Sequence, residues 1–314
     1  MAATLYLDHR GLELSLQGKA LVIHQAGEYQ RSIPLNLLER IVCRASVDIK
    51  TSVLASLADR GIGVSLFGGR KGRLAAHLSG AGTLDVQRRV GQYRCYLDRS
   101  ARIEWSTRLI THKLLRQQRL LQRALRQRPD RRLLLFRSNE RIEVLRQRLL
   151  QEPFATIDSL RGIEGAAAHH YFQAYAGILP PGLEFTGRNR RPPRDPVNAL
   201  LSLGYTLLHG DIQQAVVSVG LDPWLGLYHE PAHGRASLVC DIQELYRHII
   251  DEFTWVLTRQ RLLRENHFAT EGDACLLAKE GRAIYYPLYE TMMQARRRGM
   301  RRVLLYLARA WQAQ

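Results

Sequence analysis

Residues 73–97 read RLAAHLSGAGTLDVQRRVGQYRCYL, and the spacing of apolar residues changes within this stretch. Its first six residues are typical of a strand, whereas from Val86 onward apolar residues recur three and four apart with arginines between them, as on a helix. The small residues SGAGT at 79–83 between them mark a linker. We therefore predict a β-rich domain over 1–80, a linker at 81–84 and a helical domain over 85–314.

Upstream of this linker, short runs of alternating apolar and polar residues predict strands, as at 12–16. One helix is expected where VLASLAD at 53–59 follows Thr51 or Ser52 as the cap and Gly61 ends the run. The predicted strands cover residues 4–8, 12–16, 20–25, 40–45, 62–67 and 73–78.

Downstream of the linker the apolar spacing stays helical, so we predict an α+β protein: a small N-terminal β-domain followed by a larger all-α C-terminal domain. The last run contains Pro287 and Gly299, which should divide it into two or three shorter helices. Residues 185–196, FTGRNRRPPRDP, are expected to form an extended loop. The predicted helical runs are 86–97, 103–126, 140–151, 157–175, 196–217, 240–261, 272–281 and 285–311.

The composition narrows the class of protein. A length of 314 residues accommodates two domains, and 46% apolar residues exclude a disordered chain. No apolar run approaches the roughly 18 residues that cross a bilayer, and MAATLYLDHRG lacks the features of a signal peptide. The four cysteines, Cys43, Cys95, Cys240 and Cys275, form no CxxC pair and are typical of reduced thiols. We therefore expect a cytoplasmic protein without a membrane partner.

The chain carries 46 basic and 29 acidic residues, a net charge of +17, and nearly all of the positive charge is arginine. The guanidinium group pairs with two phosphate oxygens at once, so such a chain attracts polyanions, of which nucleic acid is the commonest in a cytosol. A GC-rich genome would explain arginine in place of lysine but not the excess charge. Nucleic-acid binding is therefore favoured, with an anionic membrane surface as the weaker alternative.

Three acidic residues and one histidine interrupt apolar helical segments. Glu164, in SLRGIEGAAAHHYF, is flanked by Gly162 and Gly165, which would let backbone or a phosphate approach its carboxylate. Alternatively, Glu164 lies in the first turn of a helix capped by Ser159 and is stabilised only by the helix dipole. His229 ends the apolar run PWLGLYHE, where a hydrogen-bonded core histidine is the alternative.

Asp241 and Glu244 are three residues apart in SLVCDIQELYRHIIDE and share one face of a helix. Such a pair repels unless a cation lies against it, and Arg247 offers an ordinary surface ion pair as the alternative. Two carboxylates and an imidazole suit Mg²⁺ or Mn²⁺ with positions open for phosphate oxygens. In a basic protein, this combination indicates phosphoryl chemistry on nucleic acid.

Taken together, these motifs resemble the CRISPR-associated adaptation integrases, metal-dependent endonucleases that insert new spacers. The resemblance covers nearly the whole chain in order and implies an N-terminal β-domain, a helical C-terminal domain and a homodimer, whose contact we expect on exposed strands of the β-domain. The matching strings are LASLADRGIGVSLF, VQRRVGQYR, LRGIEGAAAHHYF, FTGRNRRPPRDPVNALLSLGYTLL, GLDPWLGLYHE and GRASLVCDIQELYR.

By this resemblance, Glu164, His229 and Glu244 lie at the family's metal-ligand positions, and Asp241 lies at the acidic position that supports the catalytic site. The third ligand is often aspartate, and we expect the geometry to adjust to the extra methylene of Glu244. The implied cofactor is Mg²⁺ or Mn²⁺. The implied partners are double-stranded DNA of the protospacer and the CRISPR repeat, a second copy of the chain and a small ferredoxin-like adaptation protein.

The implied reaction is strand transfer, in which the 3′-hydroxyl of a short DNA fragment attacks a phosphodiester at the edge of a CRISPR repeat. A branched-DNA repair nuclease and a non-catalytic nucleic-acid-binding scaffold are the alternatives. Certain arginines are expected to hold the DNA backbone, although any one could belong to a solvated basic face. They are Arg188, Arg190, Arg191 and Arg194 in the loop, and Arg88, Arg89 and Arg94 at the start of the helical domain.

Overall fold

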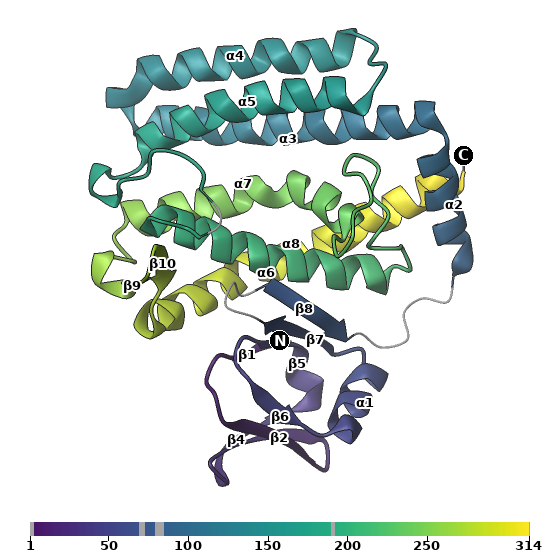
Figure 1. Ribbon diagram of the computed structural model, residues 1–314, viewed down its shortest axis with the longest axis vertical. Helices are drawn as coiled ribbons and strands as arrows, with labels where there is room; N and C mark the ends of the chain where they lie inside the picture. The colour runs from purple at the N-terminus through teal and green to yellow at the C-terminus, as the bar shows by residue number, and fades with distance from the viewer. Residues whose placement is uncertain (1–2, 69–72, 79–84, 190–191, 314) are drawn as a thin grey trace.

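The computed structural model describes residues 3–68, 73–78, 85–189 and 192–313. The N-terminal part is rich in strands and the remainder is mostly helical (Figure 1), which confirms the predicted α+β class. The N-terminal elements are β1 (Ala3–Leu7), β2 (Leu12–Gln17), β3 (Ala20–Gln25), β4 (Glu28–Pro34), β5 (Leu38–Cys43), β6 (Val47–Ile49), α1 (Thr51–Asp59), β7 (Gly63–Gly68) and β8 (Arg73–Leu78).

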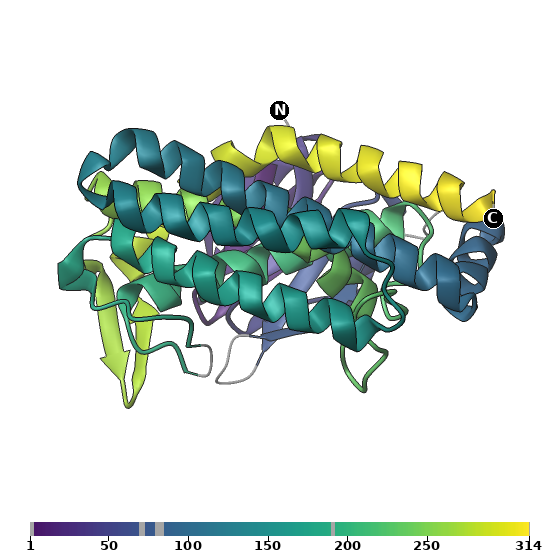
Figure 2. The same ribbon diagram turned by 90° about the horizontal axis from the view of Figure 1, so that it is seen from above.

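The linker predicted at 81–84 lies outside the described residues. The elements that follow are α2 (Val86–Leu97), α3 (Arg99–Gln127), α4 (Arg132–Gln151), α5 (Ile157–Ile178), α6 (Pro196–Ser218), α7 (Ser237–Arg259), β9 (Phe268–Glu271), β10 (Ala274–Leu277) and α8 (Lys279–Gln312). In Figure 1, α3, α4 and α5 form an upper layer over α6, α7 and α8, and Figure 2 shows α8 along one edge of the molecule.

The N-terminal strands form two four-stranded sheets, in the orders β4-β3-β2-β6 and β1-β5-β7-β8. The two sheets share a core in which Leu14, Leu21, Ile41 and Val64 are fully buried. Strands β4 and β6 were not predicted. Every residue of β4 except Ile33 is exposed, so its sequence lacks the alternation that reveals a half-buried strand.

The sheet β1-β5-β7-β8 lies against the helices (Figure 1). Its strands contribute to two cores, because successive residues of a strand point to opposite faces of the sheet. In β5, Ile41 belongs to the core between the two sheets, whereas Val42 belongs to the core of the helical domain. In β1, Tyr6 stacks on Tyr286 of α8 with ring centroids 4.2 Å apart. The β-domain is therefore packed firmly on α6 and α8.

Two helix predictions are wrong. Residues 285–311 belong to one continuous helix, α8, which passes through Pro287 and Gly299 without a break. Tyr289 and Met293 on its inner face are fully buried, and this packing outweighs the backbone hydrogen bond that the proline cannot make.

The helix predicted at 272–281 is instead an antiparallel hairpin of β9 and β10, so the C-terminal domain is not wholly helical. Gly272 adopts the left-handed conformation, with φ +59°, that the turn between the two strands requires. Cys275 and Leu277 are buried on alternate positions of β10, and the helix begins only at Lys279. Period-two burial over so short a segment is easily mistaken for part of a helical turn.

Two expectations from the composition concern membrane spans and cysteines. Within the described residues, no helix has both the length and the apolar character needed to cross a bilayer. The four cysteine thiols are free, and three of them are buried.

Four charged side chains, two of them buried and two partly buried, meet where the β-domain contacts the helices. Arg40 of β5 contacts Asp211 of α6, and its Nη2 lies 2.7 Å from Oε1 of Glu290 on α8. Arg297 of α8 pairs with the same two carboxylates, 3.0 Å from Asp211 Oδ1 and 2.8 Å from Glu290 Oε2. Burial raises the pKa of Glu290, but the two guanidinium groups and the Tyr6 hydroxyl outweigh it and lower that pKa to about 2.

Changing Arg40 to leucine should lower the free energy of unfolding at pH 7 by about 3–5 kcal/mol, because the buried Asp211 and the partly buried Glu290 would be left with one guanidinium. The contribution of Glu290 is present above its ordinary pKa of 4.5 and is lost as the pH falls towards about 2, so the deficit should shrink in acid. Denaturant titration measures both effects. The control Arg31→Leu, on exposed β4, should change stability by no more than about 0.5 kcal/mol, and equal losses in the two variants would contradict the role of the network.

Candidate functional site

Glu164 lies on α5, about two turns from the start of the helix. The cap is Thr156, whose Oγ1 accepts a hydrogen bond from Ser159 N at 3.2 Å, and not Ser159 as the dipole interpretation assumed. A helix dipole acts mainly within the first turn, so it does not account for Glu164. The positions where Gly162 and Gly165 would carry a Cβ are open, so the helix surface beside Glu164 is uncrowded.

Glu244 lies on α7 with a side chain that is only 8% exposed. Its Oε1 accepts a hydrogen bond from Arg247 Nη1 at 3.0 Å, and the guanidinium of Arg247 lies over the ring of Tyr205. Burial raises the pKa of Glu244, but Arg247 and Lys113 outweigh it and lower that pKa to about 2. The ion pair anticipated from the sequence is therefore present, but it is buried and keeps Glu244 ionised.

Lys113 of α3 joins these two carboxylates, and the sequence analysis missed it. Its ammonium contacts Glu164 Oε1 and lies 2.5 Å from Glu244 Oε2, although the lysine side chain is only 7% exposed. Lys113 is the one lysine of a helix otherwise rich in arginine, which is the only signal the sequence offers. Three helices, α3, α5 and α7, thus meet at one buried ammonium.

His229 lies in the loop before α7 and is held by Asp241 at the start of that helix. The carboxylate of Asp241 accepts hydrogen bonds from the backbone N–H groups of Leu227, Tyr228 and His229, at 2.6, 3.0 and 2.8 Å. Its Oδ1 also lies 2.7 Å from Nδ1 of His229. Because a carboxylate only accepts, Nδ1 donates, and in the neutral imidazole the lone pair is on Nε2.

The same loop is fixed from the other side by residues that sequence reasoning did not identify. Gln92 of α2 is completely buried, and its Nε2 donates to the carbonyls of Asp222 and Leu225 at 2.9 and 2.8 Å. Arg102 of α3 donates from Nε to the Leu227 carbonyl at 2.7 Å. A polar residue that supports a loop far along the chain leaves no local pattern, so only the fold reveals it.

The structure therefore brings Glu164 and Glu244 onto one cation, and His229 is held by Asp241, one helical turn before Glu244 on α7. Asp241 is saturated by its four donors and supports His229. In the part of the chain that the structure describes, no three His, Cys, Asp or Glu side chains already converge on one point. Two carboxylates and one imidazole nitrogen are nonetheless donors of the kinds that suit Mg²⁺ or Mn²⁺.

The predicted DNA-binding arginines divide into two groups. Arg88 pairs with Asp85 and donates to the Val219 carbonyl, at 2.9 Å in each case, and Arg188 contacts Asn198 Oδ1. These two arginines therefore hold the fold together. The exposed members are Arg89, Arg94 and Arg194, whereas Arg190 and Arg191 lie outside the described residues.

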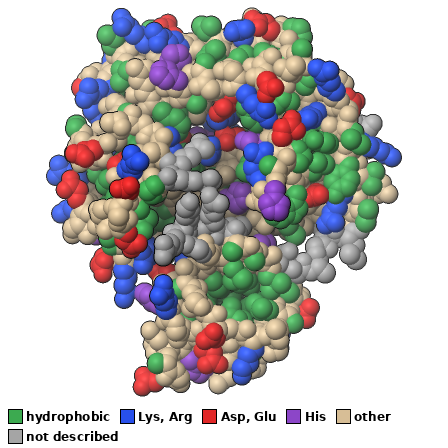
Figure 3. Space-filling model, viewed as in Figure 1, with side chains coloured by type: hydrophobic (Ala, Val, Ile, Leu, Met, Phe, Trp, Pro, Cys, Tyr) green, Lys and Arg blue, Asp and Glu red, His purple; other side chains and the backbone are tan. Residues whose placement is uncertain are grey.

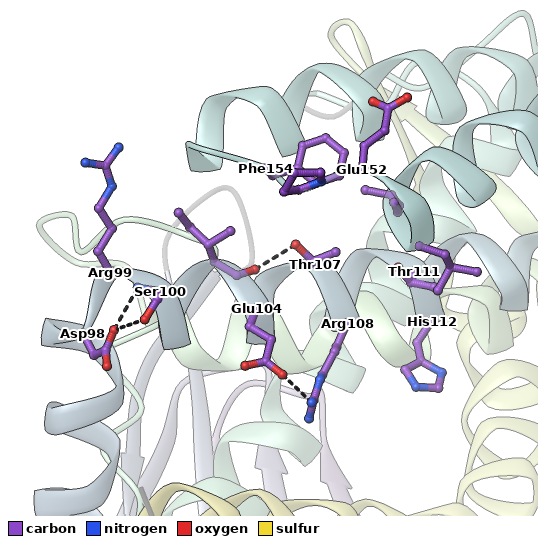
Figure 4. Close-up of a pocket in the computed structure, with 14 residues that line it drawn as sticks. Asp98, Arg99, Ser100, Glu104, Thr107, Arg108, Thr111, His112, Glu152 and Phe154 are labelled. Carbon is purple, nitrogen blue, oxygen red and sulfur yellow. Dashed lines mark hydrogen bonds and ion pairs between the residues drawn. The ribbon is translucent and has the colours of Figure 1, made fainter.

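A groove of about 820 Å³ runs along α3 between Asp98 and His112 and reaches the end of α4 (Figure 4). Within it, Glu104 pairs with Arg108, and none of the predicted site residues lines it. On the face shown in Figure 3, acidic, basic and histidine side chains gather at a hollow below the upper layer of helices. The groove along α3 is therefore separate from the carboxylates joined by Lys113.

Comparisons with known proteins agree with this architecture. The family model described as CRISPR associated protein Cas1 matches residues 5–291. The CRISPR-associated endonuclease Cas1 1 of Thermodesulfovibrio yellowstonii is 37% identical over 302 residues, which cover 94% of this chain and 92% of the relative. The CRISPR-associated endonuclease Cas1 3 of Thermus thermophilus is 33% identical over 82% of this chain and 75% of the relative.

Solved structures share the fold at lower identity. A Cas1 protein from Thermotoga maritima has a TM-score of 0.83 at 22% identity and covers 98% of this chain and 97% of its own. A casposase bound to an integration product has a TM-score of 0.83 at 20% identity, covering 99% and 91%. A Cas6-RT-Cas1–Cas2 complex has a TM-score of 0.81 at 22% identity, covering 99% of this chain and 35% of that one. The resemblance drawn from the motifs is thus confirmed, and the chain belongs to the Cas1 family of CRISPR-associated proteins.

Proposed function

We propose that this chain is a divalent-metal-dependent DNA endonuclease and integrase that inserts short foreign DNA fragments as new spacers into a CRISPR array. The observation that carries the proposal is the convergence of Glu164 and Glu244, from two helices, onto one cation, with His229 held on Asp241 one turn before Glu244. The name of the Thermodesulfovibrio relative and the reaction product bound to the casposase support the same chemistry. The net charge of +17 supports DNA as the substrate.

Glu164, Glu244 and Nε2 of His229 would hold Mg²⁺ or Mn²⁺. When bound, such an ion polarises the scissile phosphate and offsets the negative charge that develops during the attack. The 3′-hydroxyl of the fragment forms a new bond to phosphorus, and the bond from that phosphorus to the leaving oxygen of the repeat strand breaks.

The surrounding residues prepare these three side chains. Asp241 keeps the proton of His229 on Nδ1, so that Nε2 presents a lone pair. Arg247 keeps Glu244 ionised although its carboxylate is buried. Gly226 allows the loop to pass close to α7, because a Cβ at this position would lie 2.7 Å from the backbone of Ser237.

For partners, we propose double-stranded DNA of the protospacer and the repeat, a second copy of the chain and a small ferredoxin-like adaptation protein. This chain shares its fold with about a third of one chain in a solved Cas6-RT-Cas1–Cas2 complex, and the composition of that complex supports assembly with a further CRISPR protein. The position of the dimer contact on the exposed strands of the β-domain stays a prediction.

Changing Glu164 to glutamine should reduce integration by about 100-fold or more, because one charged ligand of the reacting centre is lost. The assay offers DNA fragments with free 3′-hydroxyls and a supercoiled plasmid that carries the repeat, in Mg²⁺ or Mn²⁺. The matched control is Asp158→Asn on the same helix, whose side chain is 82% exposed and which should retain activity. Joined products identify an integrase, nicked products alone a repair nuclease, and binding without products a scaffold. Full activity of Glu164→Gln would contradict the assigned role.

Changing Asp241 to asparagine should weaken Mn²⁺ binding by about 10–100-fold, because the amide can no longer accept from all four donors and His229 loses its orientation. Isothermal titration calorimetry measures the affinity. Asp273→Asn, in the exposed turn between β9 and β10, is the control that should bind Mn²⁺ like the unmodified chain. An unchanged affinity in Asp241→Asn would show that Asp241 only stabilises the loop.

Changing Arg89 and Arg94 together to glutamine should weaken DNA binding and reduce the dependence of log affinity on log salt concentration by about 0.9 for each lost phosphate contact. Both arginines are exposed on α2, near the loop that carries His229. Fluorescence anisotropy at several salt concentrations gives the slope. Arg10 and Arg60, both exposed and outside the strands of the β-domain, are changed together to glutamine as the control that removes the same charge, and an equal effect would indicate a general loss of charge rather than a DNA contact.

A further inference from the structure

The ammonium of Lys113 lies where the two proposed carboxylate ligands face each other. It contacts Glu164 Oε1 and lies 2.5 Å from Glu244 Oε2. The other oxygen of Glu244 already accepts a hydrogen bond from Arg247, and Oε2 makes no well-aligned hydrogen bond to the residues that the structure describes. Oε2 is thus the oxygen left for a metal ion, and Lys113 lies against it.

The charges at this point are balanced before any metal ion arrives. Two carboxylates, Glu164 and Glu244, are matched by two cations, Lys113 and Arg247. A divalent ion added to this set would leave two excess positive charges in a largely buried place, which is strongly unfavourable. One of the two cations therefore has to leave when the ion binds.

The side chains themselves show which cation can leave. The guanidinium of Arg247 is fixed by its hydrogen bond to Glu244 and by the ring of Tyr205, whose centroid is 4.6 Å away. Lys113 ends in a compact ammonium on a flexible four-carbon stem. The side chain of Glu164 is 25% exposed, so solvent reaches the site from that side and offers the ammonium a hydrated position.

We propose that Lys113 is a tethered cation: it neutralises Glu164 and Glu244 in the metal-free chain and is displaced by the divalent ion, so that it sets the metal affinity of the site. This inference rests on the metal site proposed above. It makes Lys113 a positioning residue that also holds α3, α5 and α7 together before metal binding.

The test compares Lys113→Met with the unmodified chain, because methionine has a similar length and no charge. Without divalent ions, in EDTA, the melting temperature of Lys113→Met should be lower, since only Arg247 remains to balance two carboxylates. With the competing ammonium removed, Mn²⁺ should bind at least tenfold more tightly in calorimetry. Saturating Mn²⁺ should therefore raise the melting temperature more in the variant than in the unmodified chain.

Three further variants make the outcome decisive. Lys113→Gln, a polar and uncharged replacement that keeps hydrogen-bond donors, should also tighten Mn²⁺ binding and serves if Lys113→Met does not fold. Lys113→Arg keeps the charge and should bind Mn²⁺ no more tightly than the unmodified chain. Arg119→Met, at an exposed position of the same helix, should change neither measurement.

Two results would overturn the proposal, and they differ from failure of the metal site itself. If the unmodified chain binds Mn²⁺ and neither Lys113→Met nor Lys113→Gln binds it more tightly, Lys113 is a purely structural ion pair. If Arg119→Met tightens Mn²⁺ binding as much as they do, the effect comes from net charge. If neither the unmodified chain nor the Lys113 variants bind Mn²⁺, the proposed metal site is wrong and the tethered cation is rejected with it.

Discussion

The buried ammonium of Lys113 fixes two side chains at once, because a carboxylate inside a protein has to be balanced by a cation or by hydrogen-bond donors. Glu164 and Glu244 come from α5 and α7, and each contacts the ammonium that α3 supplies. The distance between the two carboxylates is therefore set by electrostatics as well as by apolar packing among the three helices. Because both carboxylates face one ammonium, they also face the point that the proposed metal ion would occupy, so the same contact bears on the fold and on the proposed chemistry.

The histidine is positioned by a different means. His229 lies in a loop, and loops are usually the least precise part of a fold. Here one carboxylate, Asp241, accepts hydrogen bonds from three successive backbone N–H groups and from the imidazole, while Gln92 and Arg102 hold the loop from α2 and α3. The precision of the site comes from these supports, which are anchored on helices and transmit the rigidity of the helices to the loop.

Sequence patterns revealed what is local and missed what depends on contacts between distant segments. The apolar spacing located most of the helices, and motifs identified Glu164, His229, Asp241 and Glu244. The continuity of α8 through Pro287 could not be predicted, because it depends on the surface that buries the helix. Lys113 could not be predicted either, since its partner Glu164 is 51 residues away and a single lysine in a basic helix resembles any solvated side chain.

The basic side chains fall into two groups: those that form ion pairs or hydrogen bonds within the fold, and those that do not. Arg40, Arg88 and Arg102 are all held by acidic partners or backbone carbonyls, so their presence says nothing about DNA. Each internal ion pair, however, removes one charge of either sign, so pairing inside the fold leaves the net charge of +17 unchanged. That excess can be balanced only by small ions or by a polyanion, and when arginines neutralise DNA phosphates, release of the cations condensed on the DNA drives binding. The net charge therefore supports attraction to DNA. The pairing of arginines within the fold limits which surfaces DNA can contact through arginine.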